Sequence, residues 1–299
     1  MKATAVSIQS LRRSHADLLL VSVAIIWGTS YGATKGALLF YPVLGFLAVR
    51  FLLTFILLLP AMSSESPRAL IAGIPLGLIL LAVFLCETYG VAITSASNAA
   101  FLISLCVVFT PLVEWQMFEQ RPPTSALLAA GVSLGGALLL TQAAPIEMNR
   151  GDWLMIAAAI ARACLVCWTK KLTQETHISA LALTGAQSGV VGFGSLGAMM
   201  LAPGELPHFP TDLGFWMATV YLVVFGTLFA FFAQNYAVKR TSPTRASLLM
   251  GLEPLFGALF ATLWLNEQLG FLAWIGGSMM VAASLWAGWS RSGEVETSG

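Results

Sequence analysis

Long apolar segments alternate with short polar connections along the whole chain. Ten of these segments hold about 20 residues each, the length that a helix needs to cross a hydrocarbon core of roughly 30 Å. They cover residues 17–37, 43–61, 69–93, 97–117, 124–141, 152–170, 179–201, 212–236, 243–264 and 270–290. The connections are too short for a soluble domain. The pattern therefore predicts an all-α integral membrane protein in which residues 1–299 form a single domain with ten transmembrane helices.

Basic residues precede the first segment, as they do in a secretory signal peptide. The apolar run is too long for such a signal, however, and it contains Trp27 and Lys35 without a clear cleavage site of small residues. We therefore expect the first segment to be retained as a helix.

One stretch of sequence occurs twice. Residues 89–99 (YGVAITSASNA) recur 147 positions later as residues 236–246 (YAVKRTSPTRA), with five of eleven positions identical. Asp17 and Asp152 stand at the start of two matching helices, 135 positions apart. These correspondences predict two homologous repeats of five helices, 17–141 and 152–290. Because five is odd, the repeats must insert with opposite orientations, an arrangement that places a central cavity between them near the membrane midplane.

Composition and charge agree with this class and predict an orientation. The chain is 58% hydrophobic and 10% charged, with a mean hydropathy of +0.82. If the N-terminus is cytoplasmic, the outer loops hold only Arg150, whereas the inner segments hold Lys2, Arg12, Arg13, Arg68, Arg121, Lys170, Lys171, Lys239, Arg240, Arg245 and Arg291. By the positive-inside rule we expect both termini in the cytoplasm and the chain in the inner (plasma) membrane. The net charge of +1 gives no reason to expect nucleic acid as a partner.

An ordered set of motifs resembles the EamA family of the drug/metabolite transporter (DMT) superfamily. The motifs are residues 27–31 (WGTSY), 50–52 (RFL), 94–99 (TSASNA), 241–246 (TSPTRA), 253–254 (EP) and 266–267 (NE). The resemblance spans almost the whole chain and is strongest to amino-acid exporters of the YddG type, which handle aromatic and other neutral amino acids. It implies a ten-helix bundle, a central cavity, and alternating access by rocking of the two halves. The chain departs from the pattern in the sixth helix, where Arg162 occupies the position that corresponds to Trp27 in the first half.

Ionisable residues within the apolar segments are candidates for the pathway, because charge in a bilayer is costly and usually faces a bundle interior. Three are basic and three acidic, which suggests pairing: Lys35, Arg50, Arg162, Glu87, Glu114 and Glu253. Arg50 and Glu253 follow the family pattern, and we expect them to be architectural, either as a buried ion pair or as partners of backbone groups. Lys35 and Glu114 lie near helix ends and are expected to extend to the interface.

Arg162 and Glu87 are harder to assign to architecture alone. Arg162 is near the predicted midplane, where its guanidinium would bind either the carboxylate of a substrate or that of an internal glutamate. Glu87 is replaced by Gln234 in the other repeat, so the shared architecture does not require it. Its carboxylate would receive an ammonium group, carry a proton, or pair with a neighbouring helix.

The first helix carries an aromatic stripe that would either stack on a substrate or serve as packing. Trp27, Tyr31 and Lys35 share one face, and Gly28, Gly32 and Gly36 form an adjoining face that would let another helix approach closely. Gly131 with Gly135 and Gly185 with Gly189 have the same spacing. Further candidates for the cavity wall are Tyr89, Tyr236, Asn98 and Phe101, so the cavity is expected between helices one, three, four, six, eight and nine.

Motifs for other chemistry are missing from the sequence. Cys164 and Cys167 form a CxxC without a second ligand pair, the three histidines are scattered, and no phosphate-binding loop occurs. We therefore expect no enzyme activity, no cofactor and no metal.

The expected partners are a small-molecule substrate and the lipid bilayer, and a homo-oligomer stays open. The predicted function is a secondary transporter that exports small metabolites, foremost aromatic or neutral amino acids. The alternatives are a drug or sugar-nucleotide carrier of the same fold and, less favoured, an integral-membrane enzyme.

Overall fold

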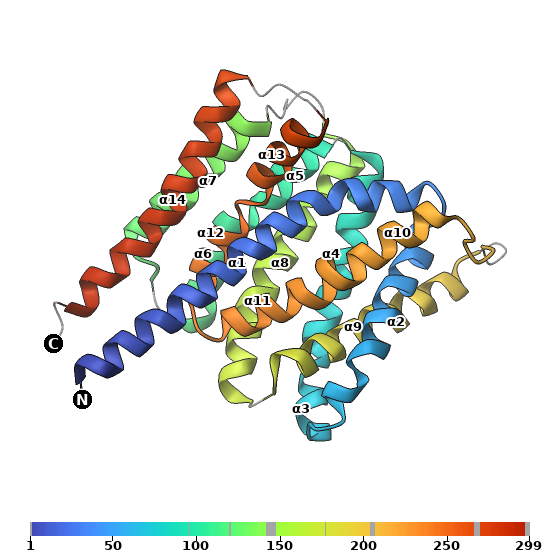
Figure 1. Cartoon of the computed structure of the whole chain (residues 1–299), viewed down its shortest axis with the longest axis horizontal. Coiled ribbons are helices and arrows are strands. Elements are labelled where there is room, and N and C mark those ends of the chain that lie inside the picture. Colours follow the sequence, from blue (N-terminus) through green and yellow to red (C-terminus); the bar gives the residue numbers. More distant parts are fainter. Residues whose placement is uncertain are drawn as a thin grey trace.

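The computed structural model describes residues 2–94, 96–119, 121–141, 148–176, 178–203, 207–265 and 270–296, and every regular element within them is a helix (Figure 1). The first half of the chain contains α1 (Lys2–Leu38), α2 (Val43–Met62), α3 (Pro67–Ala72), α4 (Ile74–Ile93), α5 (Ala96–Ser104), α6 (Cys106–Phe118) and α7 (Thr124–Thr141). The second half contains α8 (Arg150–Glu175), α9 (Ala180–Leu201), α10 (Leu213–Tyr221), η1 (Leu222–Phe229), α11 (Ala230–Val238), α12 (Pro243–Met250), α13 (Glu253–Leu265) and α14 (Phe271–Glu296).

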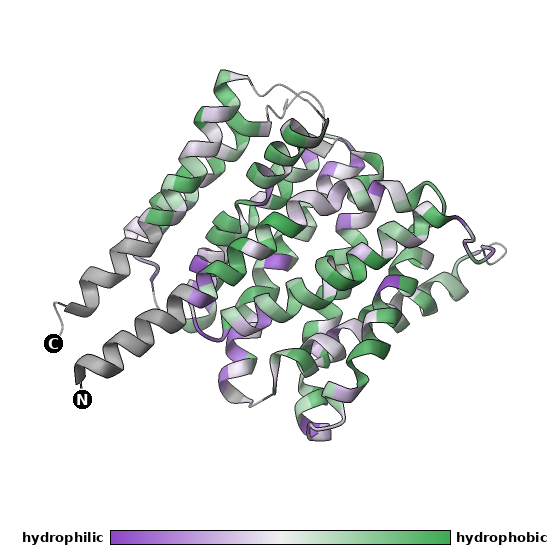
Figure 2. Cartoon of the chain, viewed as in Figure 1, coloured by the Kyte–Doolittle hydropathy of each residue, from purple (hydrophilic) through white to green (hydrophobic). Residues whose placement is uncertain are grey.

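Seven segments of the described residues are long and apolar enough to cross a membrane, and they coincide with seven of the ten predicted spans. The other three spans are also helical, as α9, as α12 with α13, and as α14. Figure 2 shows apolar residues over most of the bundle and polar residues mainly near helix ends and loops. Large apolar side chains lie exposed on the outside, among them Leu201, Leu263 and Leu285. Such a surface suits lipid, so the chain is a multi-pass membrane protein.

Four predicted spans are not the continuous α-helices that the apolar pattern suggests. The span 69–93 is interrupted at Gly73, and the span 97–117 is interrupted at Leu105. The span 243–264 is interrupted at Gly251 and Leu252. Pro254 explains the interruption at Gly251 and Leu252, since proline has no N–H to donate to the carbonyl four residues earlier in a continuous helix. The span 212–236 contains the π-helix η1, which is wound more widely than an α-helix and shifts its backbone hydrogen bonds.

Pairs of helices pack through small residues. Helices α2 and α9 lie side by side at one edge of the bundle and α7 and α14 at the other, while α4 packs on α8, and α1 packs on α10, η1 and α11 (Figure 1). A Cβ atom on Gly28 of α1 would stand 2.6 Å from the backbone of α13, so only glycine permits this approach. The close approach does not continue along the predicted glycine stripe, because a Cβ atom added to Gly32 or Gly36 would meet no atom of the described residues within 4 Å.

The other two predicted glycine pairs have different outcomes. Gly185 and Gly189 do contact α2, as the pattern suggests. A Cβ atom added to Gly131 would meet nothing within 4 Å in the part of the chain that the structure describes, and the close contact between α7 and α14 is made instead by Gly136 against Gly276.

Polar contacts join the two halves of the chain at opposite ends of the helices. Arg245 at the start of α12 donates to both carboxylate oxygens of Asp17 in α1, at 2.9 and 2.5 Å. Thr94, which follows α4, donates its hydroxyl to Asp152 at the start of α8.

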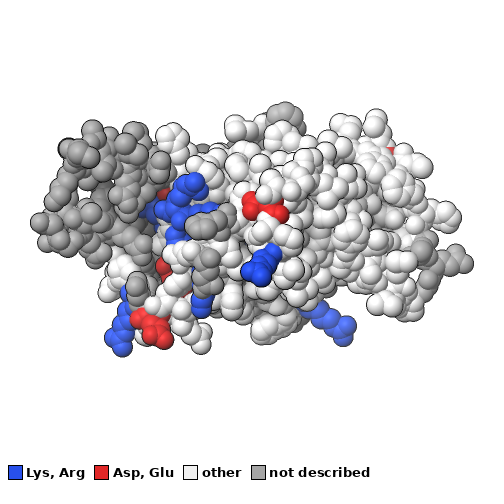
Figure 3. Space-filling view, turned by 90° about the horizontal axis from the view of Figure 1, so that it is seen from below, with Lys and Arg blue, Asp and Glu red and all other residues white. Residues whose placement is uncertain are grey.

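Figure 3 shows a face on which Lys and Arg side chains gather over its left and middle parts, while much of its right part carries no charge.

Glu114 and Lys35, which were expected to extend to the membrane interface, both have partners within the chain. The Glu114 carboxylate accepts hydrogen bonds from the backbone N–H of Thr244, at 2.8 Å, and from its hydroxyl. The ammonium group of Lys35 lies 3.5 Å from the carbonyl of Thr94. Both side chains therefore bind the chain at helix ends.

Candidate functional site

A cavity lies inside the bundle where six helices of both halves converge. It encloses about 590 Å³ with its opening included, but it is narrow. The walls come from α1, α2, α4, α8, α11 and α13: Trp27, Ser30, Tyr31, Thr34, Arg50, Leu80, Val83, Phe84, Glu87, Thr88, Val91, Arg162, Leu165, Phe231, Gln234 and Glu253. The predicted fourth helix contributes no residue to this wall, whereas the second helix contributes Arg50.

A buried ion pair forms one side of the cavity. Nη2 of Arg162, in α8, lies 3.0 Å from Oε2 of Glu253, the first residue of α13. Their side chains are 8% and 5% exposed. The guanidinium carbon also lies 4.2 Å from the ring centre of Trp27, so an aromatic face and a carboxylate both stabilise its positive charge. Arg162 thus has an internal partner, which was one of its two predicted roles.

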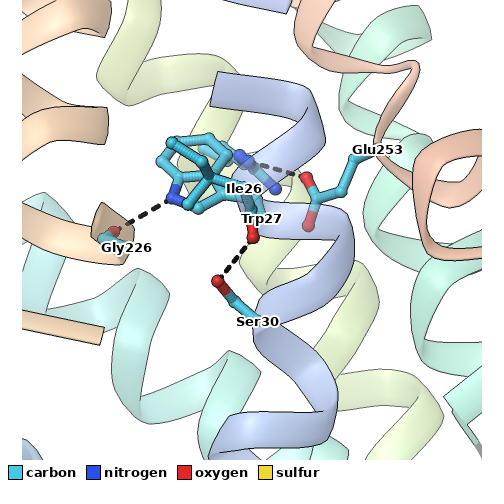
Figure 4. A network of polar contacts seen from close by, with 6 residues as sticks. Ile26, Trp27, Ser30, Gly226 and Glu253 are labelled. Carbon is cyan, nitrogen blue, oxygen red and sulfur yellow. Dashed lines mark hydrogen bonds and ion pairs between the residues drawn. The ribbon is translucent and has the colours of Figure 1, made fainter. Parts of the chain in front are cut away.

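The π-helix η1 supplies a carbonyl group that two cavity residues share. The indole N–H of Trp27 donates to the carbonyl of Gly226 at 3.1 Å, as Figure 4 shows. Nη2 of Arg50 donates to the same oxygen at 3.2 Å, and its Nε donates to the hydroxyl of Thr227 at 2.7 Å. Arg50 is therefore a partner of backbone and hydroxyl groups, one of the two architectural roles predicted for it, and Glu253 pairs with Arg162 instead.

Aromatic rings form another part of the wall. The ring centres of Trp27 and Phe231 are 5.4 Å apart, and those of Phe84 and Phe231 are 5.8 Å apart. The guanidinium carbon of Arg50 lies 5.2 Å from the ring centre of Phe84. The cavity therefore offers an apolar aromatic surface next to charged groups.

Three polar side chains in the wall have groups that remain able to form a hydrogen bond or an ion pair. The Nε2 atom of Gln234 is buried without a hydrogen-bond partner among the described residues. The buried hydroxyl of Tyr31, near Glu253, has no partner within bonding distance in that part of the chain either. Glu87 forms no ion pair with any residue that the structure describes. Buried polar groups normally have partners, so the groups of Gln234 and Tyr31 are suited to contact water or a ligand, and so is the half-buried carboxylate of Glu87.

The seven predicted site residues divide into two groups. Trp27, Tyr31, Glu87 and Arg162 line the cavity together. Tyr89 is 41% exposed, Asn98 is half-buried near the start of α5, and Phe101 packs in an apolar cluster between α1, α7 and α13. These three do not line the cavity.

Several wall residues were not predicted as substrate contacts. Glu253 was expected to be architectural, and Phe84, Phe231 and Gln234 were not named as candidates. Gln234 had a signal in the sequence, since it occupies the position of Glu87 in the other repeat. Among the described residues, no group of three or more His, Cys, Asp or Glu side chains is placed to hold a metal ion.

Comparisons with known proteins agree with this architecture. The sequence pattern of the EamA-like transporter family matches the chain twice, at residues 14–142 and 149–289. An uncharacterized transporter of Archaeoglobus fulgidus is 26% identical, over 92% of this chain and 86% of that protein. The uncharacterized inner membrane transporter YedA of Escherichia coli K12 is 26% identical, over 88% and 87% of the two chains.

Another relative carries a more specific name. A protein of Streptantibioticus cattleyicolor named "Probable terminal-alkyne amino-acid exporter" is 24% identical, over 91% of this chain and 93% of that protein. One solved crystal structure has the same fold, with a TM-score of 0.76 at 15% identity, over 92% of this chain and 96% of the other.

Proposed function

Because the chain belongs to the EamA-like transporter family, within the drug/metabolite transporter superfamily, it is a membrane transporter, and we propose that it exports amino acids, foremost aromatic and neutral ones. The observation that carries this proposal is the composition of the cavity wall, where two guanidinium groups, two carboxylates and several aromatic rings surround one space. A neutral amino acid presents the complementary set, with a carboxylate, an ammonium group and an uncharged side chain. The name of the Streptantibioticus relative supports the same substrate class.

Each part of such a substrate has a complementary group in the wall. The ammonium group would bind the carboxylate of Glu87, which has no internal ion pair among the described residues. The side chain would lie against Trp27 and Tyr31. The carboxylate would lie on the side of Arg162, whose guanidinium keeps further N–H donors beyond the one bound to Glu253.

Transport would proceed by rocking of two inverted repeats, 17–141 and 152–290. The family pattern matches each half once, which supports a duplication. Two pairs of positions that correspond between the halves also touch at the centre of the bundle: Phe84 with Phe231, and Trp27 with Arg162. Corresponding residues meet in this way on a two-fold axis, so the cavity would lie on the axis between the repeats.

The contacts at the two ends of the bundle fit this movement. Asp17 and Asp152 are corresponding residues, and each binds the opposite half, through Arg245 and Thr94 respectively. Breaking one contact while keeping the other would open the cavity to one side at a time. The cavity is narrow when both contacts are formed, so an amino acid would enter only after one of them breaks.

The proposed location is the inner membrane with both termini in the cytoplasm. The Escherichia coli relative is named an inner membrane transporter. The eleven basic residues that would face inward, against one facing outward, support this orientation.

The test is counterflow in proteoliposomes. Vesicles are loaded with one unlabelled amino acid, and entry of a labelled aromatic amino acid is followed. We expect exchange with aromatic and neutral amino acids, and its loss in Arg162→Ala protein that remains folded. If folded wild-type protein exchanges no amino acid, the proposed substrate class is wrong, and drugs and nucleotide conjugates become the next compounds to test.

A further inference from the structure

Gln234 and Glu87 occupy corresponding positions in the two halves of the chain, and both line the cavity. They lie 147 residues apart, on α11 and α4. Each lies three residues after a phenylalanine, Phe231 or Phe84, and the rings of these two phenylalanines are in contact at 5.8 Å. One helical turn beyond this contact, the first half therefore presents a carboxylate and the second half an uncharged amide.

The amide of Gln234 has the features of a ligand-binding donor. The residue is 1% exposed, and its Nε2 atom has no hydrogen-bond partner among the described residues. An unpaired N–H group in an apolar interior is unfavourable, so a group that accepts its hydrogen bond would gain affinity. The neighbouring Asn235 differs, because its Nδ2 donates to Thr184 and Gln187 at 3.0 and 2.9 Å.

We propose that Gln234 is a specificity-determining residue that donates a hydrogen bond to the carboxylate of the substrate, while Glu87 binds the ammonium group. This inference rests on the proposed amino-acid substrate. A carboxylate at both positions would suit an amine, because two negative groups attract a cation and repel an acid. One carboxylate and one amide instead suit a molecule that carries both an ammonium group and a carboxylate. The difference between the two halves would thus fix which way the amino acid lies in the cavity.

The experiment compares three compounds with the same ring in the counterflow assay: phenylalanine, phenethylamine, which lacks the carboxylate, and phenylpropionate, which lacks the amine. Wild-type protein should prefer phenylalanine. In Gln234→Glu, the ratio of phenylalanine to phenethylamine exchange should fall about tenfold or more, since a charge-assisted hydrogen bond becomes a repulsion. The matched control is Gln174→Glu, which adds the same charge at an exposed position near the end of α8 and should leave the ratio unchanged.

A double variant separates recognition from a structural role. Glu87→Gln should weaken phenylalanine exchange, and Glu87→Gln combined with Gln234→Glu should restore part of it, because the amino acid can bind in the opposite direction. If Gln234→Glu does not fold, Gln234→Leu replaces it and should raise the half-saturating concentration of phenylalanine without changing that of phenethylamine.

Two results would overturn the inference in different ways. If wild-type protein exchanges phenylalanine and folded Gln234 variants keep the wild-type ratio, the amide contacts only water or protein, and the proposed function stands without it. If folded wild-type protein does not exchange phenylalanine at all, the proposed substrate class fails, and the role of Gln234 fails with it.

Discussion

The ion pair between Arg162 and Glu253 should show strong energetic coupling. The two charged atoms lie 3.0 Å apart, and both side chains are more than nine-tenths buried. Replacing one partner leaves the other charge without compensation in a medium of low dielectric. Arg162→Met and Glu253→Gln should therefore each lower the free energy of unfolding by about 3–5 kcal/mol.

The double variant should be less destabilised than the sum of the two single variants. With both residues replaced, no charge is left unpaired, and the main further loss is the contact of the guanidinium with Trp27 at 4.2 Å. Such a contact contributes about 2 kcal/mol when it is shielded from water. The double variant should accordingly lose about 2 kcal/mol, whereas independent effects would add up to about 6–10 kcal/mol.

The measurement is a denaturant titration of purified protein in detergent micelles, followed by tryptophan fluorescence. Arg245→Met serves as the comparison, because the Arg245–Asp17 pair is more exposed, at 24% and 22%, and should contribute about 1 kcal/mol or less. The reasoning is refuted if the losses of the two single variants simply add in the double variant. It is also refuted if removing the exposed pair costs as much as removing the buried one.

Three more substitutions test other parts of the structure. Gly28→Leu should abolish folding, because the new Cβ would stand 2.6 Å from the α13 backbone, whereas the control Gly32→Leu should yield monodisperse protein. Equal yields of the two variants in size-exclusion chromatography would contradict this. Asp17→Asn should weaken the contact with Arg245. A cysteine placed in the cavity should then react several-fold faster with a maleimide added from one side of the membrane only. Faster reaction from both sides would argue against a contact that closes one end of the bundle. Trp27→Leu should reduce counterflow of phenylalanine more than that of alanine, because an aromatic wall favours aromatic side chains; equal reductions would show that the ring serves packing alone.

The positions of the helices could be predicted from the sequence because the length of an apolar run is itself the signal. The predicted span 124–141 coincides with α7, and most others agree within a few residues. The interruptions inside the spans could not be predicted in the same way. Hydropathy does not depend on backbone hydrogen bonding, so it gives no sign of a broken helix. At Leu105 there is also no neighbouring proline to indicate the interruption. The carbonyl of Gly226 binds Trp27 and Arg50 where η1 departs from α-helical bonding, so their partner could not be predicted either.

Helical periodicity explains why some candidates on one helix line the cavity and another does not. The wall residues of α4 fall at positions 80, 83, 84, 87, 88 and 91, which form one stripe along a helix. Tyr89 follows Glu87 by two residues, about 200° around the axis, and therefore lies on the opposite face. The duplicated stretch that made Tyr89 a candidate begins near the end of α4, and it carries no information on the face of the helix.

The differences between the repeats indicate the site better than their identities do. Identical residues such as Asp17 and Asp152 lie at helix ends, where they bind the opposite half. At two of the positions where the repeats differ in charge within the membrane, Trp27 against Arg162 and Glu87 against Gln234, both members line the cavity. A shared architecture requires the first kind of residue twice, whereas an asymmetric substrate needs different groups on its two sides. In a duplicated transporter, a charge that lines the cavity and is present in only one repeat should therefore be tested first as a substrate contact.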